Sequence, residues 1–414
     1  MTRRFGAAAA LAAAALLLAA CGGGGGIGGT GIADGGGGGG TGGTGGTGGA
    51  LGTLRVSMTD APSCGYDAVN ISVQKVRVHR SAAAGDADAG WSEVALSPAR
   101  RVDLLTLTNG VLLELGQTAL PAGKYTQLRL VLGSNGSATP FANSVVPSGG
   151  SETALDTPSG QQSGVKLNVD ITVEPDKIAD FVLDFDACKS VVRRGSSGRF
   201  SLKPVIAAIP RLSDAGQRIV GFVDPAIALG STVVSVQSNG TVVRSTPPDA
   251  TGRFVLYPVA PGTYDLVVTA DGRAAAVMTG VPVTITEFTF TNPETARIAP
   301  PTSTARSASG TVSVGGSVVD TLATVAASQS LAGGPTVQIA AQPVDGLTGG
   351  YSFTLPVAAP VKTAYVAAAT TLTFGADASA AGKYTLVASV PGQADKTVSI
   401  DIGGAPAVSP FAFP

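Results

Sequence analysis

The sequence predicts an all-β protein in which tandem β-sandwich domains follow a signal peptide and a disordered glycine-rich tether. Charged residues make up 13% of the chain, about half the share found in an average globular protein. The 57 glycines and 26 prolines interrupt the chain at short intervals. Between them lie short stretches rich in Val and Thr, in which apolar and polar residues alternate with period 2. This combination favours short strands joined by turns over helices.

Residues 1–20 are predicted to be a lipoprotein signal peptide. Arg3 and Arg4 form a short positive region at the start. The uncharged run of Ala and Leu from Phe5 to Leu18 is too short to cross a bilayer as a stable helix. A segment that is removed by processing therefore fits better than a transmembrane helix.

The apolar run closes on Leu18-Ala19-Ala20-Cys21, which resembles the signal of bacterial lipoproteins. The resemblance implies that the sulfur of Cys21 is diacylated and that Cys21 becomes the mature N-terminus, and two acyl chains anchor a protein stably. The alternative is ordinary secretory cleavage, which leaves Cys21 unmodified. Gly22 stands where lipoproteins retained in the inner membrane carry Asp. We therefore expect an outer-membrane location, facing the periplasm or the cell surface.

Residues 21–52 are predicted to be the lipidated cysteine and a disordered tether. From Gly22 onward the sequence is almost entirely Gly and Thr, and it cannot bury enough apolar surface to order itself. A Gly-rich coil of this length spans roughly 30 Å on average. The alternative, a phosphate-binding glycine loop, needs a strand before it and a helix after it. The sequence predicts neither at these positions.

The balance of charge excludes nucleic acid as a partner. The chain has 27 Lys and Arg against 28 Asp and Glu, which gives a net charge of −1. Without a basic surplus there is no electrostatic basis for binding nucleic acid or an anionic lipid surface. We therefore expect the membrane as a partner only through the N-terminal lipid.

Residues 53–210 are predicted to form the first domain, an antiparallel β-sandwich or open barrel. The turn Thr59-Asp60-Ala61-Pro62 follows the first strand, and the strand pattern shifts phase before Val76, which indicates a bulge or a bend. The predicted strands are Leu54–Met58, Asn70–Val73, Val76–His79, Trp91–Leu96, Tyr125–Leu132, Val165–Val173, Ala179–Phe185 and Phe200–Ile209.

One further segment of this domain allows two interpretations. Val102–Leu107 and Val111–Leu115 are predicted to form a hairpin around Asn109-Gly110, a dipeptide typical of tight hairpin turns. The alternative is a short helix at Leu104–Leu107.

Six motifs of this domain occur in one order: Thr59-Asp60-Ala61-Pro62, Val69-Asn70-Ile71, Leu120 to Leu130, Ser163 to Leu167, Asp184-Phe185-Asp186-Ala187, and Leu202 to Ile206. Together they resemble a bacterial family called domain of unknown function 4382, over residues 51–210. The resemblance implies an exported, β-rich and often lipidated module. It implies no assigned activity.

Residues 217–292 are predicted to form a small seven-strand sandwich. The first strand contains Ile219-Val220-Gly221-Phe222-Val223, and later motifs are the turn Thr251-Gly252-Arg253-Phe254 and the strand Pro261 to Val268. These motifs resemble the carboxypeptidase regulatory-like, or transthyretin-like, domain. Because that domain is an accessory module, the resemblance carries over no zinc ligand and no catalytic residue.

Residues 307–414 are predicted to be a diverged second copy of this domain, after a connector rich in Pro, Thr and Ala. Thr348 to Tyr351 repeats the turn of the second domain, and Ala381 to Val387 repeats its Gly-x-Tyr strand. Two insertions, around Leu322 to Gly334 and Pro356 to Ala381, interrupt the match.

A Gly-x-Tyr element occurs in each of the three domains, at Tyr125, Tyr264 and Tyr384. A shared ligand subsite is one hypothesis. The favoured interpretation is structural, because glycine permits the turn that enters a strand. The aromatic residue then buries its ring and keeps its hydroxyl hydrogen-bonded.

The sequence contains no recognisable catalytic group of residues. His79 is the only histidine. It lies on the same side of a strand as Lys75 and Arg77, opposite the apolar residues, so we expect it to face solvent. Ser72 and Lys75 match the spacing of a Ser-x-x-Lys nucleophile, but they lie in strand sequence instead of at a helix start. We therefore expect that the protein is not an enzyme.

The acidic segment around Asp180, Asp184 and Asp186 is the candidate for a metal site. On a strand these three carboxylates would share one face. They would have to be solvated, paired with Lys or Arg, or bound to a hard cation such as calcium. A bridge between Cys64 and Cys188 would add Asp60 as a neighbour. Apart from this calcium hypothesis no cofactor is expected.

Together these features favour a non-enzymatic lipoprotein of the outer membrane with a binding or structural role in the cell envelope. An envelope protein or a glycan is the expected partner. The alternative function is carbohydrate binding by the transthyretin-like domains, which resemble carbohydrate-binding folds. Sugar sites usually stack rings on exposed aromatic side chains, whereas aromatics are only 5% of this chain and Trp91 is its only tryptophan.

With Cys21 lipidated, Cys64 and Cys188 remain as a candidate disulfide in an oxidising compartment, and two separately buried thiols are the alternative. We expect both thiols to resist alkylation until the protein is reduced. Reduction should lower the free energy of unfolding by about 4 to 5 kcal/mol, because the bridge closes a loop of well over a hundred residues and its removal frees that loop in the unfolded state. Alkylation of both cysteines in the unreduced, unfolded protein would contradict the bridge.

Overall fold

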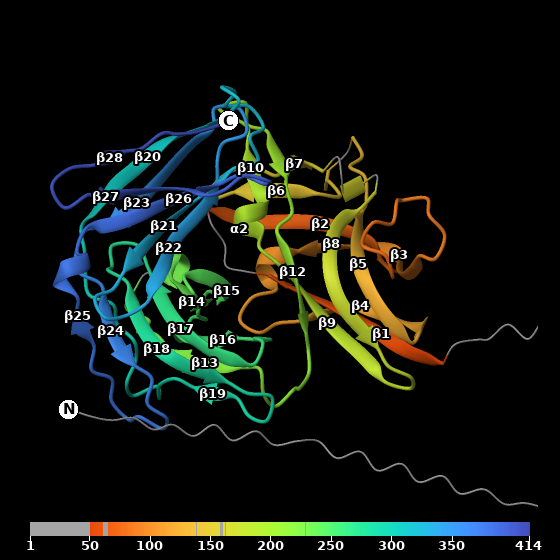
Figure 1. The fold of residues 1–414 in the computed structure, drawn as a ribbon, viewed down its shortest axis with the longest axis horizontal. Coiled ribbons are helices and arrows are strands. Elements are labelled where there is room, and N and C mark those ends of the chain that lie inside the picture. Colours follow the sequence, from red (N-terminus) through yellow and green to blue (C-terminus); the bar gives the residue numbers. More distant parts are fainter. Residues whose placement is uncertain (1–49, 61–64, 138, 158–159, 162, 228) are drawn as a thin grey trace, which may run out of the picture. The chain divides into compact units, whose positions relative to one another are not determined.

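The computed structural model describes residues 50–414 except 61–64, 138, 158–159, 162 and 228 (Figure 1). The predicted signal peptide and most of the predicted tether lie outside the described residues. Strands dominate the described part of the chain and form three successive units, which contain β1–β12, β13–β19 and β20–β29. The all-β class with tandem sandwiches, which the sequence predicts, is confirmed.

The first unit packs two sheets around one apolar core. The smaller sheet has the order β12-β9-β1-β4, and the larger has the order β10-β11-β7-β6-β2-β5-β8 with β3 beside β2. Leu54, Ile71 and Phe185 are among its fully buried core residues. The bounds are β1 (Leu51–Asp60), β2 (Tyr66–His79), β3 (Ser92–Asp103), β4 (Leu113–Pro121), β5 (Gly123–Leu132), β6 (Ser144–Pro147), β7 (Thr153–Asp156), β8 (Val165–Val173), β9 (Ile178–Phe185), β10 (Val191–Arg193), β11 (Phe200–Leu202) and β12 (Ile206–Pro210).

The predicted bulge is present in β2, where the register with β3 and β5 shifts between Val73 and Lys75. The predicted strand Phe200–Ile209 is divided into β11 and β12. The division moves the chain from the larger sheet to the smaller one.

The predicted hairpin around Asn109-Gly110 is wrong. β3 ends at Asp103, whose carboxylate accepts the backbone N–H of Leu105 (3.2 Å) and starts the 3₁₀ helix η1 (Leu104–Thr106). Asn109 and Gly110 do adopt positive φ angles, of 57° and 83°. However, the turn joins two sheets, because β3 pairs with β2 and β4 pairs with β1.

The second and third units share one strand order. The second has sheets β16-β13-β19 and β15-β14-β17-β18, and the third has β23-β20-β28 and β22-β21-β26-β27. In both, the first strand is antiparallel to one neighbour and parallel to the last strand. The bounds are β13 (Ile219–Phe222), β14 (Val233–Ser238), β15 (Thr241–Thr246), β16 (Arg253–Leu256), β17 (Gly262–Thr269), β18 (Ala276–Val283), β19 (Thr289–Phe290), β20 (Ala305–Val314), β21 (Thr324–Ser330), β22 (Thr336–Pro343), β23 (Gly350–Pro356), β26 (Lys383–Ser389), β27 (Lys396–Asp401), β28 (Ala407–Val408) and β29 (Phe411–Phe413).

The repeated glycines of these two units have a steric function. A Cβ added to Gly221 would lie 2.5 Å from the Phe254 ring, and one added to Gly310 would lie 2.8 Å from the Tyr351 hydroxyl. The aromatic residue after each Thr-Gly turn therefore lies against the glycine of the first strand. Only glycine leaves space for this approach.

The insertion around Pro356 to Ala381 joins the third unit to the second. Its strand β24 (Val361–Ala364) pairs in parallel with β18, and β25 (Gly375–Ala376) pairs with β24. Tyr365, Leu372 and Phe374 from the same insertion pack on the core of the second unit. One six-stranded sheet, β15-β14-β17-β18-β24-β25, thus contains strands from two units.

A buried arginine connects the second unit to the first. Arg244, in β15, has a side chain that is 1% exposed. Its guanidinium pairs with the carboxylate of Asp184 and donates to Thr59 Oγ1 at 2.7 Å. Nearby, Asn109 Oδ1 accepts the N–H of Val255 at 2.6 Å. These groups fix the position of β15 and β16 against the ends of β1 and β9.

Polar contacts also join the third unit to the other two. Gln237 Nε2 donates to the carbonyl of Gln338 at 2.8 Å, and Gln338 N–H donates to Gln237 Oε1 at 2.7 Å. The N–H of Gly195 donates to Asp345 Oδ2 at 2.7 Å. Each of the three units therefore makes specific contacts with the other two.

The two connectors between units are ordered parts of the fold. Gln217, in the first connector, is fully buried, and its Oε1 accepts the N–H groups of Leu212 (2.6 Å) and Ser213 (3.1 Å). Ile298, in the second connector, is 1% exposed and bridges to Val223. Both connectors are thus held by specific contacts and do not behave as free linkers.

We predict that Arg244→Met lowers the free energy of unfolding by about 3–5 kcal/mol, because it leaves the carboxylate of Asp184 without its partner in a nearly dry interface. Arg199→Met, which removes an exposed pair with Asp156, should cost less than about 1 kcal/mol. The double variant Arg244→Met with Asp184→Leu should recover part of the loss. Urea unfolding measures all three, and equal effects of the two single variants would contradict the importance of the buried pair.

Candidate functional site

The structure places the three acidic residues of the candidate metal site in separate ion pairs. Asp180 is 8% exposed, and its Oδ2 accepts Arg55 Nε at 2.9 Å and lies 3.5 Å from Arg211 Nε. Asp184 pairs with Arg244 of the second unit. Each carboxylate on β9 thus has its own guanidinium.

Asp186 does not extend the acidic strand as predicted. It follows the end of β9 and caps the short helix α2 (Ala187–Ser190), where its Oδ1 accepts the N–H of Lys189 at 3.0 Å and its Oδ2 lies 2.7 Å from Lys189 Nζ. The strand ends there because this carboxylate satisfies the first turn of the helix.

Asp60 lies close to this segment, as the sequence predicts. β1 and β9 run in parallel with Asp60 opposite Phe185, and Asp60 Oδ1 accepts the N–H of Ala187 at 3.0 Å. Across the residues that the structure describes, however, no group of three or more His, Cys, Asp or Glu side chains is arranged to hold a metal ion. The ion pairs therefore favour the alternative in which arginine and lysine neutralise the acidic segment, and calcium stays a hypothesis.

The cysteine predictions stay untested. Cys21 and Cys64 lie outside the described residues, and Cys188 lies in α2. The lipidation of Cys21 and the bridge between Cys64 and Cys188 therefore remain predictions.

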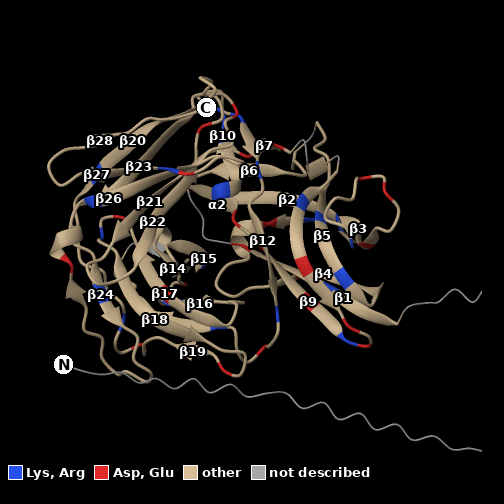
Figure 2. Cartoon of the chain, viewed as in Figure 1, with Lys and Arg blue, Asp and Glu red and all other residues tan. Residues whose placement is uncertain are grey.

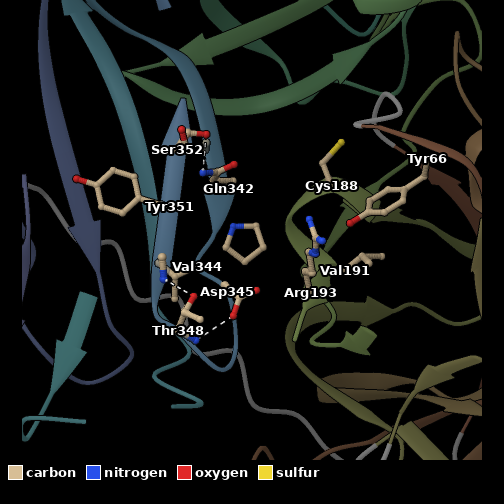
Figure 3. Close-up of a pocket in the computed structure, with 13 residues that line it drawn as sticks. Tyr66, Cys188, Val191, Arg193, Gln342, Val344, Asp345, Thr348, Tyr351 and Ser352 are labelled. Atoms are coloured by element: carbon tan, nitrogen blue, oxygen red, sulfur yellow. Dashed lines mark hydrogen bonds between the residues drawn. The ribbon is translucent and has the colours of Figure 1, made fainter. Parts of the chain in front are cut away.

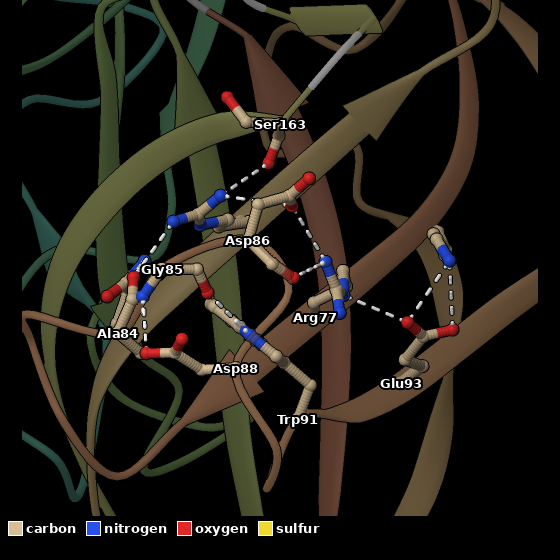
Figure 4. A network of polar contacts seen from close by, with 11 residues as sticks. Arg77, Ala84, Gly85, Asp86, Asp88, Trp91, Glu93 and Ser163 are labelled. Atoms are coloured by element: carbon tan, nitrogen blue, oxygen red, sulfur yellow. Dashed lines mark hydrogen bonds and ion pairs between the residues drawn. The ribbon is translucent and has the colours of Figure 1, made fainter.

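His79, the only histidine, and Trp91, the only tryptophan, lie in one polar network on the larger sheet of the first unit. Figure 4 shows Trp91 with Arg77 and Asp86 of this network. The guanidinium groups of Arg77 and Arg129 lie 4.5 and 4.9 Å from the Trp91 ring centroid, and the ring of His79 lies 5.1 Å away. Asp86 accepts from both arginines, at 3.0 and 3.2 Å.

The same network holds the loop between β2 and β3 in place. Trp91 Nε1 donates to the carbonyl of Gly85 at 3.0 Å, and His79 Nε2 lies 3.0 Å from the carbonyl of Ala89. His79 is only partly exposed. These contacts use both rings to fix the loop.

The Gly-x-Tyr tyrosines have the structural role that the sequence favours. Tyr125, Tyr264 and Tyr384 are all buried. The hydroxyl groups of Tyr125 and Tyr264 donate to the carbonyl four residues upstream, at 2.9 and 2.8 Å, and that of Tyr384 donates to the carbonyl of Pro356 at 2.6 Å. Since the rings are inside the sandwiches, they form no shared ligand subsite.

Another candidate site is a cavity of about 540 Å³ between the first and third units (Figure 3). Tyr66 and Arg193 line it on the side of the first unit, and Gln342 and Ser352 on the side of the third. Burial raises the pKa of the Tyr66 hydroxyl, and the charge of Arg193 partly opposes this rise. Its size lies in the range of small-molecule sites, and its hydrogen-bonding groups suit binding.

Asp345 fixes the lower wall of this cavity. Its Oδ1 accepts the N–H groups of Leu347 and Thr348, both at 2.9 Å, and its Oδ2 accepts that of Gly195 in the first unit at 2.7 Å. Burial alone would raise the pKa of Asp345, but these hydrogen bonds together outweigh it and hold the pKa below its ordinary value.

Lys and Arg are interspersed with Asp and Glu along the strands (Figure 2), as the net charge of −1 suggests. No helix in the described ranges is both long and apolar enough to span a bilayer.

We predict that Asp345→Asn lowers the free energy of unfolding by about 1 kcal/mol at pH 7. The folded-state pKa of Asp345 is depressed, so its contribution is complete above the unfolded pKa of about 4 and is lost as pH falls through the folded value. The difference between variant and wild type should therefore shrink below about pH 4. Asp395→Asn, at an exposed position, should change little at any pH, and a constant difference down to pH 2 would contradict this role.

Comparison with known proteins supports one of the three resemblances found in the sequence, and the resemblance of Leu18 to Cys21 to a lipoprotein signal stays a prediction. Residues 51–204 match the family model described as a domain of unknown function (DUF4382). No curated protein matches the chain. The resemblance of the second and third units to the carboxypeptidase regulatory-like domain stays a prediction.

Solved structures match over most of the chain, but at low similarity. They include the Bacillus anthracis TIE protein (10% identity, TM-score 0.18), which aligns over 88% of this chain and 50% of its own. A Streptococcal ancillary pilin (9%, 0.17) and BcpA, the major pilin subunit of Bacillus cereus (10%, 0.16), each align over 87% of this chain and 99% of their own. The chain therefore spans half the length of the TIE protein. These scores are too low to carry an argument. The family match covers residues 51–204, so the first β unit is similar to DUF4382 domains.

Proposed function

We propose that this chain is a lipid-anchored, non-enzymatic protein of the outer membrane, with a binding or structural role in the cell envelope. The observation that supports it best is that the three β units form one body. A nearly dry ion pair, a sheet with strands from two units and a hydrogen-bonded pair of glutamines hold them together. Such a body suits a protein that presents a fixed surface.

The contacts of His79 and the burial of Ser72, the two side chains considered for catalysis, support a non-enzymatic role. His79 is held by the carbonyl of Ala89 and the ring of Trp91. Ser72 is 8% exposed and lies within β2. A nucleophile needs a base within hydrogen-bonding reach and a position that substrate can enter. Neither residue meets this requirement.

Carbohydrate binding is the second candidate function. The buried Gly-x-Tyr tyrosines count against it, and so does Trp91, whose ring already contacts the guanidinium groups of Arg77 and Arg129, since sugar rings stack on exposed aromatic faces. The polar lining of the 540 Å³ cavity, with Tyr66 and Arg193, is the observation in its favour. A glycan array with the purified full chain tests it, and binding that Arg193→Ala abolishes would make this the leading function.

We predict that Cys21→Ser moves the protein from the membrane fraction to the soluble fraction, because the acyl chains are lost. Mass spectrometry of the wild-type N-terminal peptide should find those acyl chains on Cys21. Cys64→Ser is the matched control and should stay in the membrane fraction. A Cys21→Ser protein that remains membrane-bound, together with an unmodified wild-type peptide, would contradict the anchor.

A further inference from the structure

A second cavity, of about 280 Å³, lies where the segment 189–205 of the first unit meets the segment 321–346 of the third. Its walls are mainly apolar, and the two lysines in the lining come from the first unit. Among the apolar side chains in the lining are those of Val192, Val205, Leu322 and Val344. An apolar cavity with few polar groups is the usual form of a small-molecule site.

Thr321 provides a polar group in this cavity that has no partner. The residue is 8% exposed, and its Oγ1 is buried without a hydrogen bond to any described residue. Buried hydroxyl groups in folded proteins nearly always have a partner. A ligand with an acceptor atom would satisfy this hydroxyl.

The two residues that flank Thr321 have strained backbone angles, and one of them, Leu322, exposes an apolar side chain. Asp320 and Leu322 have φ angles of 49° and 54°. Asp tolerates this conformation, but a bulky residue such as Leu rarely adopts it. The Leu322 side chain is 52% exposed, and Val205, also in the lining, is 41% exposed. Strain of this kind persists where the surrounding structure enforces it, often at binding sites.

Of the two lysines in the lining, Lys203 is the one whose ammonium group is placed to bind an anionic ligand. Its Nζ lies 3.7 Å from Asp320 Oδ1, a carboxylate that also accepts two N–H groups of Arg194 at 3.3 Å. Lys189, by contrast, lies 2.7 Å from Asp186. Burial lowers the pKa of Lys203, against the opposing effect of Asp320. An additional anion beside Lys203 would offset this desolvation.

We propose that this cavity binds a small amphiphile with an apolar chain and a single carboxylate head. The chain covers Val205 and Leu322, and the head accepts from Lys203 Nζ and Thr321 Oγ1. The volume corresponds to on the order of ten non-hydrogen atoms, which is the size of a medium-chain fatty acid. This inference goes beyond the proposed function and does not depend on the lipid anchor.

Isothermal titration of the full chain carrying Cys21→Ser with octanoate tests the proposal, because without the lipid no detergent competes for the cavity. We expect one saturable site per chain. Lys203→Gln removes the charge and should weaken octanoate binding by roughly tenfold. Val205→Trp fills the cavity from a partly exposed position and should abolish binding. Octylammonium, with the same chain and the opposite charge, should not bind.

Two matched variants control for unspecific effects. Lys383→Gln and Val408→Trp make the same changes at exposed positions outside the lining, and they should keep octanoate affinity within about twofold. No saturable binding of octanoate, equal binding of octylammonium, or binding that Val205→Trp leaves unchanged would each overturn the proposal. Because the titration uses Cys21→Ser protein, it measures octanoate binding whether or not Cys21 is lipidated in the wild type. Failure of the lipid anchor and failure of the binding site can therefore be distinguished.

Discussion

The buried pair between Arg244 and Asp184 sets the arrangement of the first two units. A guanidinium that is 1% exposed is tolerated only where its partners are placed correctly, because desolvating an unpaired charge costs several kcal/mol. The parallel register of β1 and β9 provides this placement, since it puts Thr59 directly opposite Asp184. Arg244 reaches both groups from β15. The sheet of one unit therefore builds the acceptor site for a side chain of the next.

The acidic segment thus works as a set of attachment points. Asp180 binds Arg55 within the first unit, Asp184 binds Arg244 of the second, and Asp186 caps α2. The helix α2 and the strand β10, which follow the acidic segment, supply lining residues to both cavities, among them Cys188 and Arg193 in the larger and Lys189 and Val192 in the smaller. The cavities depend on how the units are joined, and they would not exist in any unit alone. This links the proposed rigid body to the proposed binding sites.

The repeated features of the second and third units follow from steric requirements inside a sandwich. Gly221 leaves space for the Phe254 ring and Gly310 for the Tyr351 hydroxyl, and Tyr264 and Tyr384 bury their rings with bonded hydroxyl groups. These residues recur because the same strand order needs them. The insertion around Pro356 to Ala381 in the third unit adds β24 to the sheet of the second unit. This insertion therefore supplies a contact between the two units outside the strand order that they share.

The sequence by itself determined the all-β class, the bulge in β2, the outward side of His79 and the structural role of the Gly-x-Tyr element. These depend on period-2 alternation and on the local demands of glycine and tyrosine, which neighbouring residues reveal. Only the tertiary structure decided that Asn109-Gly110 joins two sheets, that Asp186 caps a helix, that Arg244 is the partner of Asp184, and that Thr321 and Lys203 line the same cavity. Alternation shows which face of a strand is buried but not which sheet covers it, and an ion pair between residues 60 positions apart leaves no periodic signal. Both cavities lie where the first unit meets the third, and the local sequence pattern of either unit does not predict these contacts.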